Sequence, residues 1–380
     1  MKRLGRNSLV RAWGRLTSNQ FGWHTQRKIL VIESDDWGSA RIPHPNAPKE
    51  LARIGIEVAA CPYLQFDCLE GDRDLDALGS ELTSFVDSRG QPLTFTANYN
   101  VANPNFDRMR EAQFWEYHFE PFTDSIKRYQ RSLDPKNKIK QLVDSDIWCP
   151  QSHGREHINL PRWLSALQMP NSEVRAAAEV NVYGLSRQSA PSLTASIGAA
   201  FDADSADEVV QHIDTLRSGL EIFRRIFGFS STSFIAPCYV LPSRLLATLT
   251  DCGVLGMQGL HLSVGPVYPP EMTRIRRTGE FGHHQPLSLV RNVRFEPSLN
   301  PRSDVVDNAL RDIEKAFTRK KPAIICSHRV NYMGGVDPDN RGRGLYSLKT
   351  LISRVQARWP EVEFMSTPEL INVITADRGG

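Results

Sequence analysis

A segment near the start of the chain, residues 28–38, reads KILVIESDDWG. Its apolar part, Ile29 to Ile32, is typical of a strand buried in a parallel sheet, and the pair Asp35-Asp36 follows directly. In α/β folds, ligands bind and chemistry takes place at the carboxyl ends of the parallel strands. The segment therefore predicts a polar site at one end of a parallel sheet.

Two later segments repeat this arrangement of a strand followed by polar groups. A predicted strand at residues 146–151 leads into His153-Gly154-Arg155-Glu156-His157, and another at 323–327 ends at His328. Because strand ends of one parallel sheet lie together, we expect the carboxylate pair, the histidine pair and the single histidine to share a site. This set of side chains indicates metal-assisted hydrolysis.

Strands and helices alternate along most of the chain, which predicts a parallel α/β sheet or barrel. The clearest helix is predicted at 206–227, with Ser205 and Glu208 as a capping box and Gly228 as its stop signal. Residues 107–132 have helical character, and residues 334–344 indicate a loop before a helix at 345–358. Ser303 is predicted to cap another helix, and Ser366 with Glu369 the last one. The further predicted strands are 28–33, 93–97, 233–237, 254–257, 287–295 and 362–365. We interpret 28–375 as one domain and 1–27 as a basic extension.

Composition excludes several classes of function. The formal charge is +3 and the basic residues are dispersed, so a nucleic-acid partner is not expected. No apolar run approaches the ~18 residues of a membrane span, and no secretory signal is recognisable. The six cysteines form no C-x-x-C pair and are interpreted as reduced, which favours the cytoplasm. The N-terminal basic segment fits a surface helix, with membrane contact as the alternative.

The histidines carry the metal hypothesis. His153 and His157 are four residues apart, and on a helical turn both imidazoles would face one metal ion. One carboxylate of the pair Asp35-Asp36 would complete three protein ligands, which leaves positions open for water and substrate, and its neighbour would stay free to take a proton. His328 is either a general acid or a histidine bonded to nearby backbone. His283 and His284 are interpreted as exposed loop residues.

Four motifs in this order resemble those of the polysaccharide deacetylase superfamily, the NodB-homology group. The motifs are Ser34–Gly38, His153–His157, Phe234-Ile235-Ala236-Pro237-Cys238-Tyr239 and Ile324-Ile325-Cys326-Ser327-His328. The resemblance covers about residues 28–375. It implies a distorted (β/α) barrel with a divalent metal, usually zinc, with cobalt or nickel as alternatives. The implied reaction removes an acetyl group from an N-acetylated sugar or glycan.

The resemblance also implies roles for single residues. Asp35 would be the base, Asp36, His153 and His157 the metal ligands, and His328 the acid. A backbone N–H near Tyr239 would help the metal to hold the oxyanion. The residues expected to contact substrate are Trp37, Pro237, Tyr239, Arg291, Glu296, Arg329 and Asn331.

The chain departs from the family pattern in its third and fourth motifs. The third-motif arginine that steadies the base has no match, since Ile235 or Ala236 stands there. No fourth motif is found, and Arg291-Asn292 and Glu296 occupy about its place. We therefore expect a divergent branch whose substrate differs from chitin or peptidoglycan, such as a sugar precursor or a lipid-linked glycan.

Other functions remain open at this stage. The same scaffold could act as an O-acetyl esterase, or it could bind metal and glycan without turnover. A metal phosphoesterase that uses Asp35 and Asp36 would need two metal ions about 3.5–4 Å apart. A glycosidase built on two carboxylates would need no metal. Cys238 lies beside the expected site and could make the protein sensitive to thiol reagents.

Overall fold

The computed structural model describes residues 20–282, 285–299 and 304–379. Its central element is a curled, parallel sheet of nine strands in the order β8-β7-β6-β5-β2-β1-β10-β9, with β11 paired to β1. The strands of this sheet are β1 Ile29–Trp37, β2 Phe95–Tyr99, β5 Trp148–Ser152, β6 Ser233–Phe234, β7 Gly256–Gly259, β8 Leu287–Val290, β9 Val293–Arg294, β10 Ala323–His328 and β11 Glu363–Met365. A separate antiparallel pair is formed by β3 Ala102–Pro104 and β4 Phe119–Pro121.

The two ends of the sheet order are joined by a very short link. β8 and β9 stand at opposite ends of that order, yet only Arg291 and Asn292 separate them in the chain. Val290 and Val293 are three residue steps apart and can be separated by at most about 11 Å, so the two edges of the sheet lie close together. The curled sheet is therefore a distorted (β/α) barrel, which confirms the predicted fold class. We call the link Arg291-Asn292 the seam.

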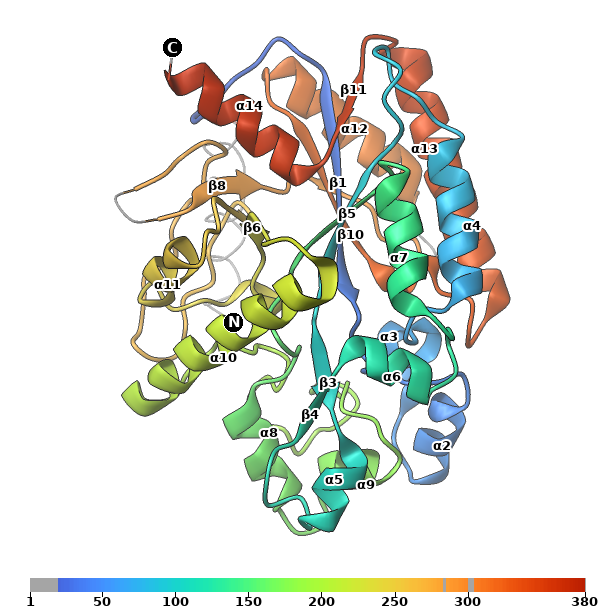
Figure 1. Cartoon of the computed structure of the whole chain (residues 1–380), viewed down its shortest axis with the longest axis vertical. Coiled ribbons are helices and arrows are strands. Elements are labelled where there is room, and N and C mark those ends of the chain that lie inside the picture. The colour runs from blue at the N-terminus through green and yellow to red at the C-terminus, as the bar shows by residue number, and fades with distance from the viewer. Residues whose placement is uncertain (1–19, 283–284, 300–303, 380) are drawn as a thin grey trace, which may run out of the picture.

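Helices cover the sheet, and smaller ones gather beyond the end to which β1 points (Figure 1). The smaller helices are α2 Ala47–Arg53, α3 Pro62–Phe66, α5 Phe106–Glu111, α6 Phe122–Arg128, α8 Leu160–Leu167 and α9 Glu173–Glu179. The helices along the flanks of the sheet are α4 Asp72–Thr83, α7 Pro135–Asp144, α10 Ala206–Phe227, α11 Leu245–Asp251, α12 Val305–Thr318, α13 Pro338–Arg358 and α14 Thr367–Gly379. Within the described part of the chain, no helix has the length and apolar character needed to cross a membrane.

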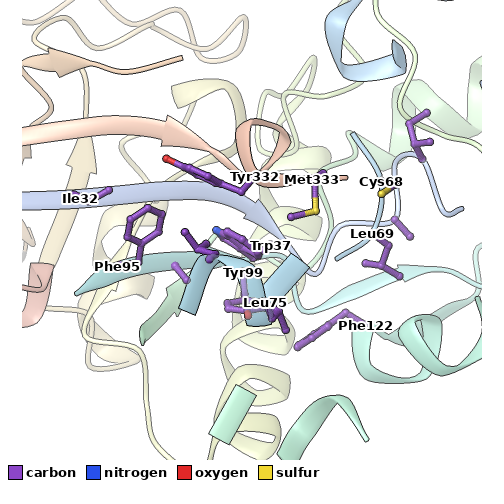
Figure 2. Packing of buried hydrophobic residues seen from close by; sticks show 14 of the residues in the cluster. Ile32, Trp37, Cys68, Leu69, Leu75, Phe95, Tyr99, Phe122, Tyr332 and Met333 are labelled. Atoms are coloured by element: carbon purple, nitrogen blue, oxygen red, sulfur yellow. The ribbon is translucent and has the colours of Figure 1, made fainter. Parts of the chain in front are cut away.

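Aromatic side chains fill the core at the carboxyl end of β1 (Figure 2). Trp37 is fully buried and meets Trp148 edge-on, with ring centroids 4.7 Å apart. Its indole N–H donates to the hydroxyl of Ser34 at 3.0 Å. Tyr99 and Phe122 lie beyond it, 5.1 Å apart. This packing fixes the end of β1 and therefore the backbone of the Asp35-Asp36 pair.

Several predicted elements are confirmed. The helix at 206–227 is α10; Ser205 caps it by accepting from the N–H of Glu208, and Gly228 ends it with φ of 80°. The predicted capping box is incomplete, because Glu208 accepts from the N–H of Asp204 and not from that of Ser205. The last helix has the predicted cap, because the Ser366 N–H and hydroxyl both donate to Glu369 at 2.7 Å. The predicted strands are present with shifted ends. β1 continues past residue 33 because the register with β10 runs on to Asp35.

Other predictions need correction. Residues 107–132 are not one helix, since β4 separates α5 from α6. The predicted loop at 334–344 is partly helix, because Asp337 caps α13 and Pro338 begins it. The predicted strand at 287–295 is two strands that meet at the seam. His283, His284, the Ser303 cap and residues 1–19 lie outside the described residues, so the division at residue 27 stays a prediction.

Candidate active site

Asp36, His153 and His157 come together although Asp36 lies more than a hundred residues before the histidine pair in the chain. The Nε2 atoms of His153 and His157 lie 3.5 Å and 3.6 Å from Oδ1 of Asp36. All three side chains are buried, and one donor atom from each lies within 4.8 Å of the others. Two imidazoles and a carboxylate at this spacing form a three-ligand group of the kind that holds catalytic zinc.

The local backbone explains this convergence. Asp36 has φ of 76°, so the chain turns sharply and the carboxylates of Asp35 and Asp36 serve different partners. The spacing of the histidine pair predicts a helical turn. The structure instead places both residues in the loop that follows β5. Gly154, with φ of 88°, turns the chain there. The two imidazole rings end 5.2 Å apart and nearly perpendicular.

Hydrogen bonds and burial prepare both histidines to act as ligands. Nδ1 of His153 donates to the carbonyl oxygen of Ile235 at 2.9 Å, which leaves Nε2 as the nitrogen with a free lone pair. Burial, aided by the nearby charge of Arg41, lowers the pKa of His157 well below its ordinary value, so this ring is neutral. Oδ2 of Asp36 is buried and has no hydrogen-bond partner among the described residues. The donor set therefore fits a divalent metal ion.

Asp35 is held from behind by the seam. Arg291 donates from Nη1 to Oδ2 at 2.6 Å and from Nη2 to Oδ1 at 2.7 Å, and Asn98 donates to Oδ1 at 2.8 Å. The same guanidinium donates from Nε to Glu33 at 2.6 Å. Burial alone raises the pKa of Asp35, but Arg291 outweighs it and lowers the pKa to about 2. Asp35 is therefore a carboxylate of fixed orientation at any working pH.

His328 lies on the strand next to Asp35, in register with it. Its Nδ1 donates to Oε1 of Glu296 at 2.6 Å, and its Nε2 lies 3.9 Å from Oδ2 of Asp35. Burial alone lowers the pKa of His328, but the Glu296 carboxylate raises it to about 10. Asn331 holds the other oxygen of Glu296 at 2.7 Å. This pair keeps the imidazole charged, with a proton to give.

Four residues expected to contact substrate have roles inside the protein instead. Arg291 and Glu296 are buried and hydrogen-bonded to Asp35 and His328, so they are placed to orient these two groups. Arg329 is fully buried and ion-paired with Asp67 and Glu70, and Trp37 lies in the core. Contact with substrate was expected because these polar and aromatic residues lie next to a motif in the sequence. In the structure they are buried against partners that are distant in sequence.

The third-motif loop has an unusual backbone. Cys238 and Tyr239 have φ of 55° and 61°, a conformation that costs energy for residues other than glycine and is concentrated at functional sites. Within this loop Pro237 is buried and Tyr239 is partly exposed. Asn331, the remaining residue expected to contact substrate, is buried in the turn that follows β10. A backbone N–H near Tyr239 is expected to hold an oxyanion; the N–H of Tyr239 itself donates to the carbonyl oxygen of Ala236 at 2.8 Å.

Three residues near the site were missed from the sequence. Arg41 pairs with Oδ1 of Asp36, Asn98 bonds to Asp35, and Tyr63 meets the His328 ring edge-on at 5.9 Å. Asn98 follows the predicted strand at 93–97, so its place at a strand end was a usable signal. Arg41 and Tyr63 lie in a stretch of mixed character that offered none.

A second group of metal-ligand types lies beside the first. Donor atoms of Glu296, Cys326 and His328 are within 4.8 Å of one another. However, Nη1 of Arg291 lies 3.6 Å from Sγ of Cys326, and Glu296 and His328 already form an ion pair. A fixed positive charge at this distance opposes a second cation.

Comparison with known proteins gives matches by structure alone. No family model matches the sequence, and no curated protein does. A provisionally named glycoside hydrolase/deacetylase from Parabacteroides distasonis is 9% identical, with a TM-score of 0.50, over 92% of this chain and 71% of that one. Provisionally named polysaccharide deacetylases from Mycobacterium smegmatis and Pseudomonas aeruginosa are 11% and 10% identical, with TM-scores of 0.45 and 0.46. The matches cover 94% of both chains for the first and 91% of both chains for the second. The Parabacteroides match confirms, for the fold, the resemblance indicated by the motifs.

Proposed function

We propose that this chain is a metal-dependent hydrolase that removes acetyl groups, most readily from an N-acetylated sugar or glycan precursor. One observation carries the proposal. A group of two histidines and a carboxylate lies beside a carboxylate steadied by arginine and a histidine charged by glutamate. His153, the base and the acid each have a hydrogen-bond partner that suits the proposed role.

A metal ion would be held by Asp36, His153 and His157, with zinc preferred and cobalt or nickel as alternatives. Such an ion would supply a Lewis acid and lower the pKa of a water molecule. The orphaned oxygen of Asp36 and the Ile235 carbonyl bonded to His153 support this assignment. Hydrolysis of an amide or an acetyl ester would use the same ligands.

Asp35 is proposed to accept the proton of the attacking water. Asp35 is ionised before the reaction, and Arg291 and Asn98 fix both carboxylate oxygens, so little reorganisation is needed as it takes up the proton. Arg291 comes from the seam and does for Asp35 what we expected of the missing third-motif arginine. This contact supports turnover over a barrel that only binds metal and glycan.

His328 is proposed to protonate the leaving amine. A general acid must hold its proton at the working pH, and Glu296 ensures this by raising the pKa of His328 to about 10. Its Nε2 is the nitrogen not engaged by Glu296, and it lies toward Asp35. The base would take a proton from the attacking water and the acid would give one to the leaving nitrogen, with acetate and a free amino sugar as products.

Metal content is the first test of the proposal. Protein purified without chelators should bind about one zinc-like ion per chain, and His153→Ala should lose it, because two ligands seldom retain zinc. Inductively coupled plasma mass spectrometry measures this without a known substrate. His118→Ala, which removes a partly exposed histidine away from the group, is the control and should keep its metal. Binding in the wild type would justify screening acetylated sugars for acetate release.

An absence of metal after addition of zinc, cobalt or nickel would refute the hydrolase mechanism. A glycan-binding barrel or a metal-free glycosidase would then be favoured. Uptake of two ions per chain would favour the phosphoesterase, which needs a second metal.

Glu296→Gln should shift the alkaline limb of the pH profile of kcat/KM. With the carboxylate gone, burial dominates, and the pKa of His328 should fall from about 10 towards or below its ordinary 6.5. In the wild type the raised pKa stabilises the fold below pH 6.5, and this contribution is lost as the pH rises through about 10. NMR titration of His328 would measure the shift. Glu314→Gln, at an exposed position, should leave the profile unchanged.

A further inference from the structure

Arg41 binds the carboxylate oxygen that a metal ion would also bind. This residue follows β1, and its Nη2 donates to Oδ1 of Asp36. That oxygen is the one toward which both histidine Nε2 atoms converge, at 3.5 Å and 3.6 Å. Three nitrogen groups therefore surround a single carboxylate oxygen, and one of them carries a full positive charge.

A divalent ion in this group would lie close to the Arg41 guanidinium. Like charges a few ångströms apart repel strongly where water is largely excluded, as it is around these buried side chains. The cation and the present hydrogen bond from Arg41 to Asp36 thus oppose each other. In the metal-free chain, in contrast, Arg41 neutralises a carboxylate that would otherwise be buried without a counter-charge.

The guanidinium of Arg41 has few hydrogen bonds to other protein groups, whereas the part of the side chain near the backbone is tightly packed. Its Nε is buried without a hydrogen-bond partner among the described residues. Its guanidinium lies over the ring of Tyr63 at 5.0 Å. A Cβ added to Gly184 would come within 2.6 Å of the Arg41 Cβ, so the base of the side chain is fixed there. Arg329, with hydrogen bonds to both Asp67 and Glu70, has no comparable freedom.

We propose, on the basis of the function proposed above, that Arg41 is a displaceable counter-ion that also selects the substrate. Metal binding releases the guanidinium from Asp36. The released guanidinium stays on Tyr63, whose ring meets that of His328 at 5.9 Å, and binds a carboxylate or phosphate of the substrate beside the acid. A guanidinium binds such groups with two parallel hydrogen bonds. The substrate class is therefore an acetylated sugar that carries negative charge.

Three variants separate the two parts of this proposal. Arg41→Gln removes the charge, and Arg41→Lys keeps the charge but loses the planar fork. Arg175→Gln is the matched control, because Arg175 also pairs with a carboxylate, Glu179 at 2.9 Å, and lies 4.2 Å over a ring, that of Phe114. Zinc affinity is measured by isothermal titration calorimetry. Binding of inorganic phosphate and of glucuronate to the cobalt-loaded proteins is followed by the visible spectrum.

Loss of the Arg41 charge is expected to change zinc affinity and anion affinity in opposite directions. Arg41→Gln should bind zinc at least about tenfold more tightly than the wild type, because a competing cation is gone. The same variant, once loaded, should bind one of the two anions at least about tenfold more weakly. Arg41→Lys should bind zinc as the wild type does, because it keeps the charge. It should bind anions as weakly as Arg41→Gln does, because it lacks the planar fork. Preference for phosphate or for glucuronate identifies which anionic group the site takes.

Equal or weaker zinc binding by Arg41→Gln would overturn the displacement, since Arg41 would then support the metal carboxylate. Anion binding that is absent in the wild type, or equal in the wild type and Arg41→Gln, would overturn the role in substrate selection. Neither result would affect the proposed hydrolase. A failure of the wild type and of Arg41→Gln alike to bind metal would overturn the hydrolase and this inference together.

Discussion

Replacing Arg291 by methionine is expected to destabilise the protein by about 3–5 kcal/mol, because the carboxylates of Glu33 and Asp35 lose their buried counter-charge. Burial alone raises the pKa of both carboxyl groups, so part of this cost will appear as proton uptake on folding. Urea unfolding at neutral pH would measure the change in the free energy of unfolding.

The control is an arginine with an exposed ion pair. Arg354 lies 2.6 Å from Asp307, and its side chain is 51% exposed. Arg354→Met should therefore cost less than about 1 kcal/mol. If Arg291→Met were equally mild, Glu33 and Asp35 would not depend on this guanidinium, and its role in holding the base would have to be abandoned.

Asp35→Asn is expected to lower turnover by about 10²- to 10⁴-fold while metal content stays at the wild-type level. The asparagine amide has nearly the shape of the carboxylate but cannot accept a proton, and Asp36 with the two histidines is left intact. Acetate release from the sugar found by screening, with metal analysis on the same samples, gives both quantities.

Asp312→Asn serves as the matched change at a partly exposed carboxylate that pairs with Lys315. It should leave both turnover and metal content unaltered. Wild-type rates in Asp35→Asn would remove Asp35 as the base. Loss of metal in that variant would instead show that Asp35 helps to bind the ion.

The sequence predicted the fold, and it placed the five candidate site residues at neighbouring strand ends, because both inferences depend on local patterns. An apolar run such as Ile29 to Ile32 predicts a buried strand wherever it occurs. The polar groups just after such runs could then be assigned to one end of one sheet. The structure places Asp35 in register with His328, and it brings His153 and His157 to Asp36.

The partners of these residues could not be predicted from local patterns. Arg291 lies 256 residues from Asp35, and Glu296 lies 32 residues from His328. A pattern marks such residues as polar and close to a motif, which is why contact with substrate was the natural expectation. Their burial depends on how the sheet curls. The helical spacing of the histidine pair misled in a similar way, since a loop turned by Gly154 brings the rings equally close.

The seam also determines when, during folding, the site can first exist. Asp35 lies near the start of the chain. Arg291 lies far along it, in the link between β8 and β9 where the two edges of the sheet meet. Contacts between residues so far apart in sequence form late, because a large loop must be closed first. Until the barrel closes, Asp35 has no arginine to hold its charge and orientation. A partly folded chain would thus lack the oriented base, and the appearance of activity during refolding would report barrel closure itself.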